Sequence, residues 1–125
     1  MLEVTLPGLP AALDGVRIGH LSDFHLGAPL SRGNGASERA ARWVAARAPE
    51  LVAITGDLVD GKPRDIGQFV GRLRNLSSRH GTYFVSGNHD HYAGWDDWSA
   101  YLEGMGVQVL KNRRVAIGDA AASFD

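Results

Sequence analysis

The sequence of 125 residues contains no cysteine, which excludes a disulfide framework and any metal site built on thiolates. A bound metal would therefore depend on oxygen atoms and on imidazole nitrogen. Excess charge is also missing, since 13 basic residues face 14 acidic ones and the formal net charge is -1. Bulk electrostatic attraction to nucleic acid or to an anionic membrane is therefore not indicated.

Long apolar runs are absent as well. Leu51–Ile54 is among the longest, far short of the roughly 20 residues that span a bilayer, and the first residues lack a signal-peptide pattern. Neither a P-loop nor a dinucleotide-binding glycine pattern follows any strand. A composition of 44% hydrophobic and 22% charged residues is nevertheless typical of a folded domain with one core.

Strands and helices are predicted to alternate along the chain. Residues 16–21 alternate apolar and other side chains, as in a strand, and 51–54 form an apolar run typical of a strand buried on both faces. The remaining expected elements are an extended segment at 2–6, a strand at 82–85, helices at 38–48, 65–78 and 95–103, and short strands at 107–110 and 115–117. This order predicts an α/β fold with a mostly parallel sheet and flanking helices.

Each of the first three strands ends in a polar cluster. Parallel strands bring their carboxyl ends to one edge of the sheet, so we expect Asp23, His25, Asp57, Asn88 and His89 to converge there. Their donor atoms suit Mn²⁺, Fe or Zn²⁺. A carboxylate can bridge two such ions, which activate water for attack on a phosphate ester, while a nearby histidine can supply a proton or positive charge near the departing oxygen.

The motifs DFH at 23–25, GDLVD at 56–60 and GNHD at 87–90 resemble, in order, the first three motifs of the calcineurin-like metallophosphoesterases. Each motif is weak alone, but the ordered triple makes chance agreement improbable. The resemblance implies a role for each residue: Asp23 and His25 bind one metal, Asp57 bridges, Asn88 binds the second metal, His89 lies over the scissile phosphate, Asp90 orients His89, and Asp60 supports the loop.

The resemblance begins at about Gly15 and covers only the first half of the family pattern. The later histidine motifs, one after a glycine and one of the form Gly-His-x-His, are absent from these residues. We therefore expect residues 1–125 to be a calcineurin-like phosphoesterase domain truncated at its C-terminus, the N-terminal half of an α/β sandwich. Asp57 and Asn88 alone would hold the second metal weakly, so the isolated chain should be inactive.

Substrate and location follow from the resemblance only broadly. It implies hydrolysis of a small phosphate monoester or diester, or of a lipid-linked phosphate, with no nucleic acid indicated. The lead-in to the first strand is similar to that of bacterial members that are often tethered by a membrane segment. That segment is missing here, so the cytoplasm and the inner face of a membrane both stay open.

Other functions, and purely structural roles for the same residues, are also compatible with the sequence. The chain is alternatively a non-catalytic metal-binding or phosphate-binding module with half a site, or a plain α/β fold whose acids are structural. Asn88 alone would also suit a left-handed turn, and His91 a loop role or a substrate contact. Trp95, Trp98 and Tyr101 fall at helical spacing and are interpreted as core rather than as a base-stacking platform.

Overall fold

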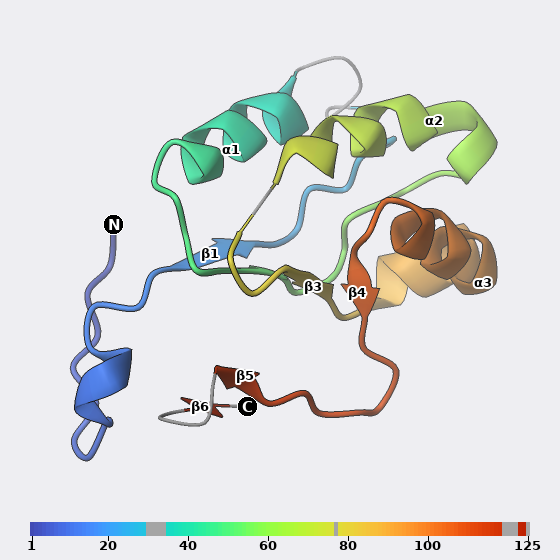
Figure 1. Ribbon diagram of the computed structural model, residues 1–125. Coiled ribbons are helices and arrows are strands. Elements are labelled where there is room, and N and C mark those ends of the chain that lie inside the picture. Colours follow the sequence, from blue (N-terminus) through green and yellow to red (C-terminus); the bar gives the residue numbers. More distant parts are fainter. Residues whose placement is uncertain (30–34, 77, 119–122, 125) are drawn as a thin grey trace.

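The computed structural model in Figure 1 describes residues 1–29, 35–76, 78–118 and 123–124. Four parallel strands form its sheet in the order β1-β2-β3-β4: β1 (Ile18–Leu21), β2 (Leu51–Ile54), β3 (Thr82–Phe84) and β4 (Gln108–Val109). The helices are α1 (Ala36–Ala45), α2 (Pro63–Val70) and α3 (Asn88–Gly104), with 3-10 turns η1 (Ala11–Leu13) and η2 (Gly71–Asn75). The predicted α/β fold is confirmed.

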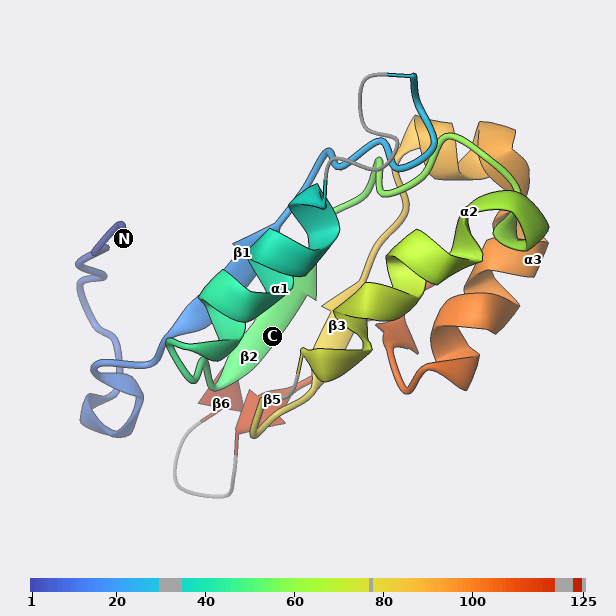
Figure 2. The ribbon, with the colours of Figure 1, turned by 90° about the horizontal axis from the view of Figure 1, so that it is seen from above.

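Helices α1 and α2 cover one face of the sheet, together with η2 (Figures 1 and 2). Strand register aligns two rows of buried residues beneath them: Gly19, Val52 and Thr82, then Leu21, Ile54 and Phe84. A Cβ at Gly19 would lie 2.7 Å from Val44 Cγ1, so α1 reaches β1 only because this residue is glycine. The core lies between the sheet and these helices and also includes Trp98 and Leu102 of α3.

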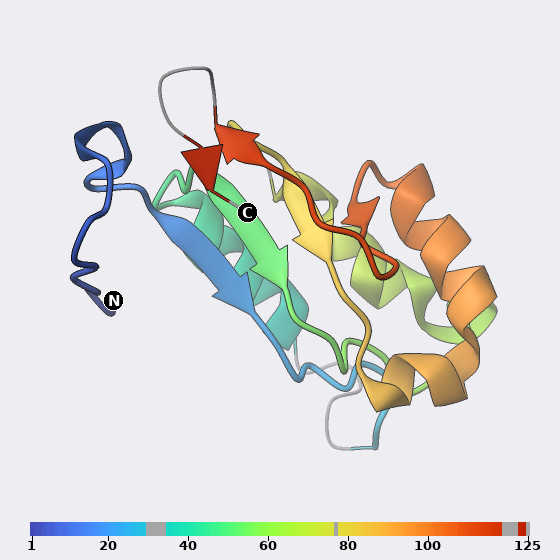
Figure 3. The same cartoon turned by 90° about the horizontal axis from the view of Figure 1, so that it is seen from below.

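The opposite face of the sheet is seen in Figure 3. Strands β5 (Ile117–Gly118) and β6 (Ser123–Phe124) pair antiparallel near the end where β1 and β2 begin. Ile18 alternates with buried Gly19 along β1, and its side chain is 53% exposed. Among the described residues, no helix combines the length and the apolar character needed to cross a bilayer.

Helices α2 and α3 differ most from the predicted ranges. Helix α3 begins at Asn88 instead of residue 95, because the Asp90 carboxylate accepts the Gly87 N–H at 2.8 Å and caps the first turn. Gly94, with φ 107°, then breaks the helix. The predicted helix 65–78 is wrong in its second half, where α2 gives way to the tighter η2 turn.

The short segments also shift. The predicted strand at 115–117 lies at 117–118, and β4 occupies only 108–109 of the range 107–110. Helix α1 begins and ends two or three residues before the predicted bounds of 38 and 48. Residues 2–6 form no strand, and the side chains of Leu2, Val4 and Leu6 in this segment are exposed. Alternation of apolar residues therefore does not produce a strand here without a partner.

Candidate metal centre

The loops after β1 and β2 run side by side beyond the sheet. The N–H of Asp23 donates to the Gly56 carbonyl at 3.2 Å, and the N–H of His25 donates to the Asp57 carbonyl at 3.0 Å. A parallel bridge between Leu26 and Val59 continues this pairing. The first two motifs are therefore aligned by backbone hydrogen bonds before any side chain contributes.

Three of the predicted ligands adopt a left-handed backbone conformation. The φ angles are 56° at Asp23, 44° at His25 and 48° at Asp57. Residues with a Cβ rarely adopt this region, which costs on the order of 1 kcal/mol or more each, and such residues cluster at functional sites. The hydrogen bonds between the two loops hold these side chains in place despite that cost.

Glycines allow the third motif to approach the second. Gly56 has φ 93°, and a Cβ there would lie 2.4 Å from the Gly87 backbone nitrogen. A Cβ at Gly87 would lie 2.1 Å from Asp57 Oδ1. In this space the His89 N–H donates to Asp57 Oδ1 at 3.0 Å, so the positive end of α3 faces a carboxylate.

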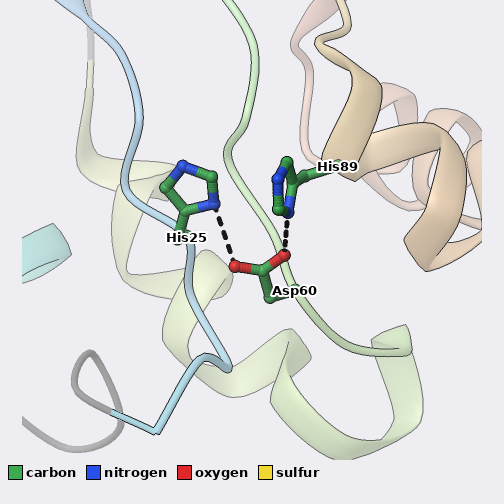
Figure 4. A group of neighbouring side chains, drawn as sticks. All are labelled: His25, Asp60 and His89. Carbon is green, nitrogen blue, oxygen red and sulfur yellow. Dashed lines mark hydrogen bonds and ion pairs between the residues drawn. The ribbon is translucent and has the colours of Figure 1, made fainter.

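Asp60 lies between two histidines, His25 from the loop after β1 and His89 from the first turn of α3 (Figure 4). Its Oδ2 is 2.9 Å from His25 Nδ1, and its Oδ1 is 2.5 Å from His89 Nδ1. Because an ionised carboxylate only accepts, both Nδ1 atoms carry the donated proton. The rings meet edge to face with centroids 4.5 Å apart. The hydrogen bond to Asp60 raises the pKa of His89.

Two groups of three side chains have ligand atoms within 4.8 Å of one another. One comprises Asp23, His25 and Asp57, and the other comprises His25, Asp60 and His89. In the second group the three side chains are already joined by hydrogen bonds. In the first, Nε2 of His25 faces Asp57 Oδ2 at 4.0 Å while Nδ1 is directed at Asp60. A carboxylate behind a ligating histidine is the usual arrangement at metal sites, so a divalent ion fits the first group better.

Asp90 is fully buried and joins the second and third loops. Its Oδ1 accepts the N–H groups of Leu58 and Val59 at 2.9 and 3.2 Å, and its Oδ2 accepts the N–H of Gly87. Burial raises the pKa of Asp90, although these backbone donors oppose the shift. The carboxylate bonded to the His89 ring is that of Asp60, a contact that sequence reasoning missed.

The remaining predicted residue of the third motif lies at the start of α3. Asn88 is exposed and helical, so the left-handed turn suggested as an alternative does not form. Its role as a ligand stays a prediction. His91 lies on the same turn, where its Nε2 is 3.0 Å from Ser86 Oγ and its ring lies 5.1 Å from that of Trp95.

Comparison with known proteins decides the family. The model of the calcineurin-like phosphoesterase family matches residues 16–119, which include all three motifs. The chain belongs to this family. The resemblance in the motifs is thereby confirmed, and the chain carries two groups of carboxylate and imidazole side chains that could hold a metal ion.

Relatives of this calcineurin-like phosphoesterase chain include two vertebrate proteins called transmembrane protein with metallophosphoesterase domain. The one from Bos taurus is 36% identical over 97% of this chain and 27% of its own length. The one from Danio rerio is 33% identical over 93% and 26%, respectively. An uncharacterized metallophosphoesterase of Campylobacter jejuni is 29% identical over 94% and 30%. The chain thus spans between a quarter and a third of the length of these relatives.

Proposed function

We propose that this chain supplies the first part of a two-metal site that hydrolyses phosphate monoesters or diesters. The observation that supports this most directly is the convergence of Asp23, His25 and Asp57 beside His89, which Asp60 links to His25. A phosphoester held at this edge would meet metal ligands on one side and an imidazole on the other. Family membership makes hydrolysis the reaction to expect of such a site.

Each ligand would have a defined part. Asp23, His25 and Asp57 would bind one divalent ion. Asp57 and Asn88 would supply some of the ligands of a second ion. When bound, such ions, of Mn, Fe or Zn, neutralise phosphate oxygens and make water a stronger nucleophile. Two protein ligands hold an ion weakly, so we propose that the other ligands of the second ion come from outside these residues.

His89 would donate the proton to the departing ester oxygen. Asp60 holds its Nδ1 atom, which leaves proton donation to the substrate to Nε2. The Asp60 hydrogen bond also raises the pKa of His89, which favours the protonated form of the ring. A protonated imidazole beside the phosphate can give its proton to the departing ester oxygen.

We further propose that a segment outside these residues brings the protein to a membrane. The names of the Bos taurus and Danio rerio relatives, both called transmembrane proteins, support this. A lipid-linked phosphate would then join small phosphate esters among the substrates to be tested. Phosphate release from lipid-linked diphosphates in vesicles is the corresponding assay.

The direct test is hydrolysis of bis-p-nitrophenyl phosphate and p-nitrophenyl phosphate with added Mn²⁺. Residues 1–125 are compared with a protein extended by roughly 130 encoded residues, about the size of a further half-domain. We expect turnover only in the extended protein, and its loss in Asp57→Asn and His89→Ala. The exposed Asp96 on α3 provides the control variant Asp96→Asn, which should retain full activity.

The other outcomes separate the alternatives. Activity in neither protein, with metal binding retained, would support the non-catalytic binding module instead. Appreciable turnover by residues 1–125 alone would refute the need for outside ligands.

A further inference from the structure

Tyr92 is an exposed aromatic residue beside the candidate centre. Its side chain is 78% exposed, more than any other large hydrophobic residue described after position 2. It follows His89 by three positions on the first part of α3, and the two rings lie edge to face with centroids 5.9 Å apart. The ring of Tyr92 therefore extends the surface next to the imidazole.

The short helical segment that carries Tyr92 is anchored on both sides. Asp90 is fully buried and bonded to three backbone N–H groups, and Ala93 is 7% exposed. Gly94 then breaks the helix, which lets Trp95 stack on Phe84 of the sheet with ring centroids 6.1 Å apart. Tyr92 is thus a rigid ring on a fixed turn, and a tyrosine loses little conformational entropy on contact because it has two χ angles.

We propose that Tyr92 packs against the organic group of the phosphate ester and gives the site a preference for substrates with a flat, aromatic or base-like group next to the phosphate. This inference rests on the proposed function. An ester oxygen protonated by His89 carries its substituent away from phosphorus, and a ring 5.9 Å from the imidazole lies within reach of that substituent. Planar groups gain from stacking or edge contact with such a ring.

A preference for an aromatic group through the ring of Tyr92 can be distinguished from recognition of the phosphate by its hydroxyl. The contact would involve the ring of Tyr92, so the Tyr92→Phe variant should keep the preference. A hydrogen bond from the hydroxyl to phosphate would be lost in that variant. The preference for an aromatic organic group should therefore depend on residue 92, whereas the affinity for the phosphate group itself should not.

The test uses the full-length encoded protein loaded with Mn²⁺ and two phosphonates that cannot be hydrolysed. Calorimetric titration compares phenylphosphonate with methylphosphonate, which share the phosphate-like group and differ in the ring. We expect the wild-type protein to bind the phenyl compound about tenfold more tightly, within the range for a base stacked on an aromatic side chain. Tyr92→Ala should remove this preference without changing methylphosphonate affinity, and Tyr92→Phe should keep it.

Trp43→Ala is the matched control. Trp43 is also an exposed aromatic, at 52%, but it lies in the second half of α1, where Arg47 covers its ring. Its loss should leave the ratio of the two affinities unchanged. Equal binding of both phosphonates by the wild-type protein, or a preference that survives Tyr92→Ala, would overturn the inference. Loss of the preference in Tyr92→Phe would also overturn it, because the hydroxyl would then be responsible.

Hydrolysis of p-nitrophenyl phosphate by the same preparation separates this inference from the proposed function. Turnover without a phenyl preference would refute only the role of Tyr92. A Tyr92-dependent preference without turnover would support the contact and refute catalysis. Absence of both turnover and phosphonate binding would refute both.

Discussion

Asp90 joins two of the three motif loops, so its replacement should loosen the whole centre. The Asp90→Ala variant removes the acceptor of three backbone N–H groups, at Leu58, Val59 and Gly87, in a fully buried position. The Asp90→Asn variant keeps the shape but replaces one acceptor oxygen by a donor. Both variants therefore remove the charge, but only Asp90→Ala removes the acceptors of all three backbone N–H groups.

The magnitudes follow from this count of bonds. A buried donor left without a partner costs about 1–3 kcal/mol, and three donors lose their acceptor, so we expect Asp90→Ala to lose about 4 kcal/mol of unfolding free energy. The amide of Asp90→Asn still accepts on one side. Burial raises the pKa of Asp90, so removing the charge offsets part of the lost bond, and a loss of about 1–2 kcal/mol is expected.

Urea unfolding at pH 7, followed by circular dichroism, measures these differences. Asp96→Asn, an exposed acid on the same helix, should stay within about 0.5 kcal/mol of the parent. Metal titration should also show weaker binding in both Asp90 variants, because Asp57 lies in the loop that Asp90 fastens. If Asp90→Ala unfolded within 0.5 kcal/mol of the parent, the backbone contacts would not stabilise the centre, and this reasoning would fail.

Two further changes test the geometry of the centre. Asp60→Asn should lower the pKa of His89, because the Asp60 hydrogen bond is the main cause that raises it, and NMR titration of the imidazole in the metal-free chain should show deprotonation at lower pH. If the pKa of His89 were the same in Asp60→Asn and the parent, the Asp60 hydrogen bond would not be its cause. Gly87→Ala places a Cβ 2.1 Å from Asp57 Oδ1 and should weaken Mn²⁺ binding by at least about tenfold. Gly104→Ala, where the added Cβ meets no atom within 4 Å beyond its own chain neighbours and helix backbone, is the control and should bind Mn²⁺ normally.

Much of the fold could be predicted because the relevant signals are local. The apolar run of β2 matches its predicted range, and Trp98 and Leu102 are buried at the helical spacing seen in the sequence. The start of α3 could not be read in this way. Its first residues are polar and show no apolar periodicity, and the helix there depends on the capping contact between Asp90 and Gly87.

The candidate centre was predictable to the level of motifs but not of contacts. Strand ends in a parallel sheet had to bring Asp23, His25 and Asp57 together, and these three side chains do converge. Which carboxylate bonds which histidine depends on side-chain direction. Asp60 and Asp90 occupy similar places at the ends of their motifs, yet one bonds two imidazoles and the other bonds only backbone groups among the described contacts.

The different exposure of Asp60 and Asp90 explains why they bond different groups. Asp90 is fully buried, where a carboxylate is tolerated only if donors surround it, and backbone N–H groups of two loops meet that need. The side chain of Asp60 is 22% exposed, and there its two oxygens bond the Nδ1 atoms of His25 and His89. One carboxylate thus fixes the backbone of the second and third motifs, and the other fixes the rings of His25 and His89. The left-handed conformations of Asp23, His25 and Asp57 persist because both restraints act on the same three loops.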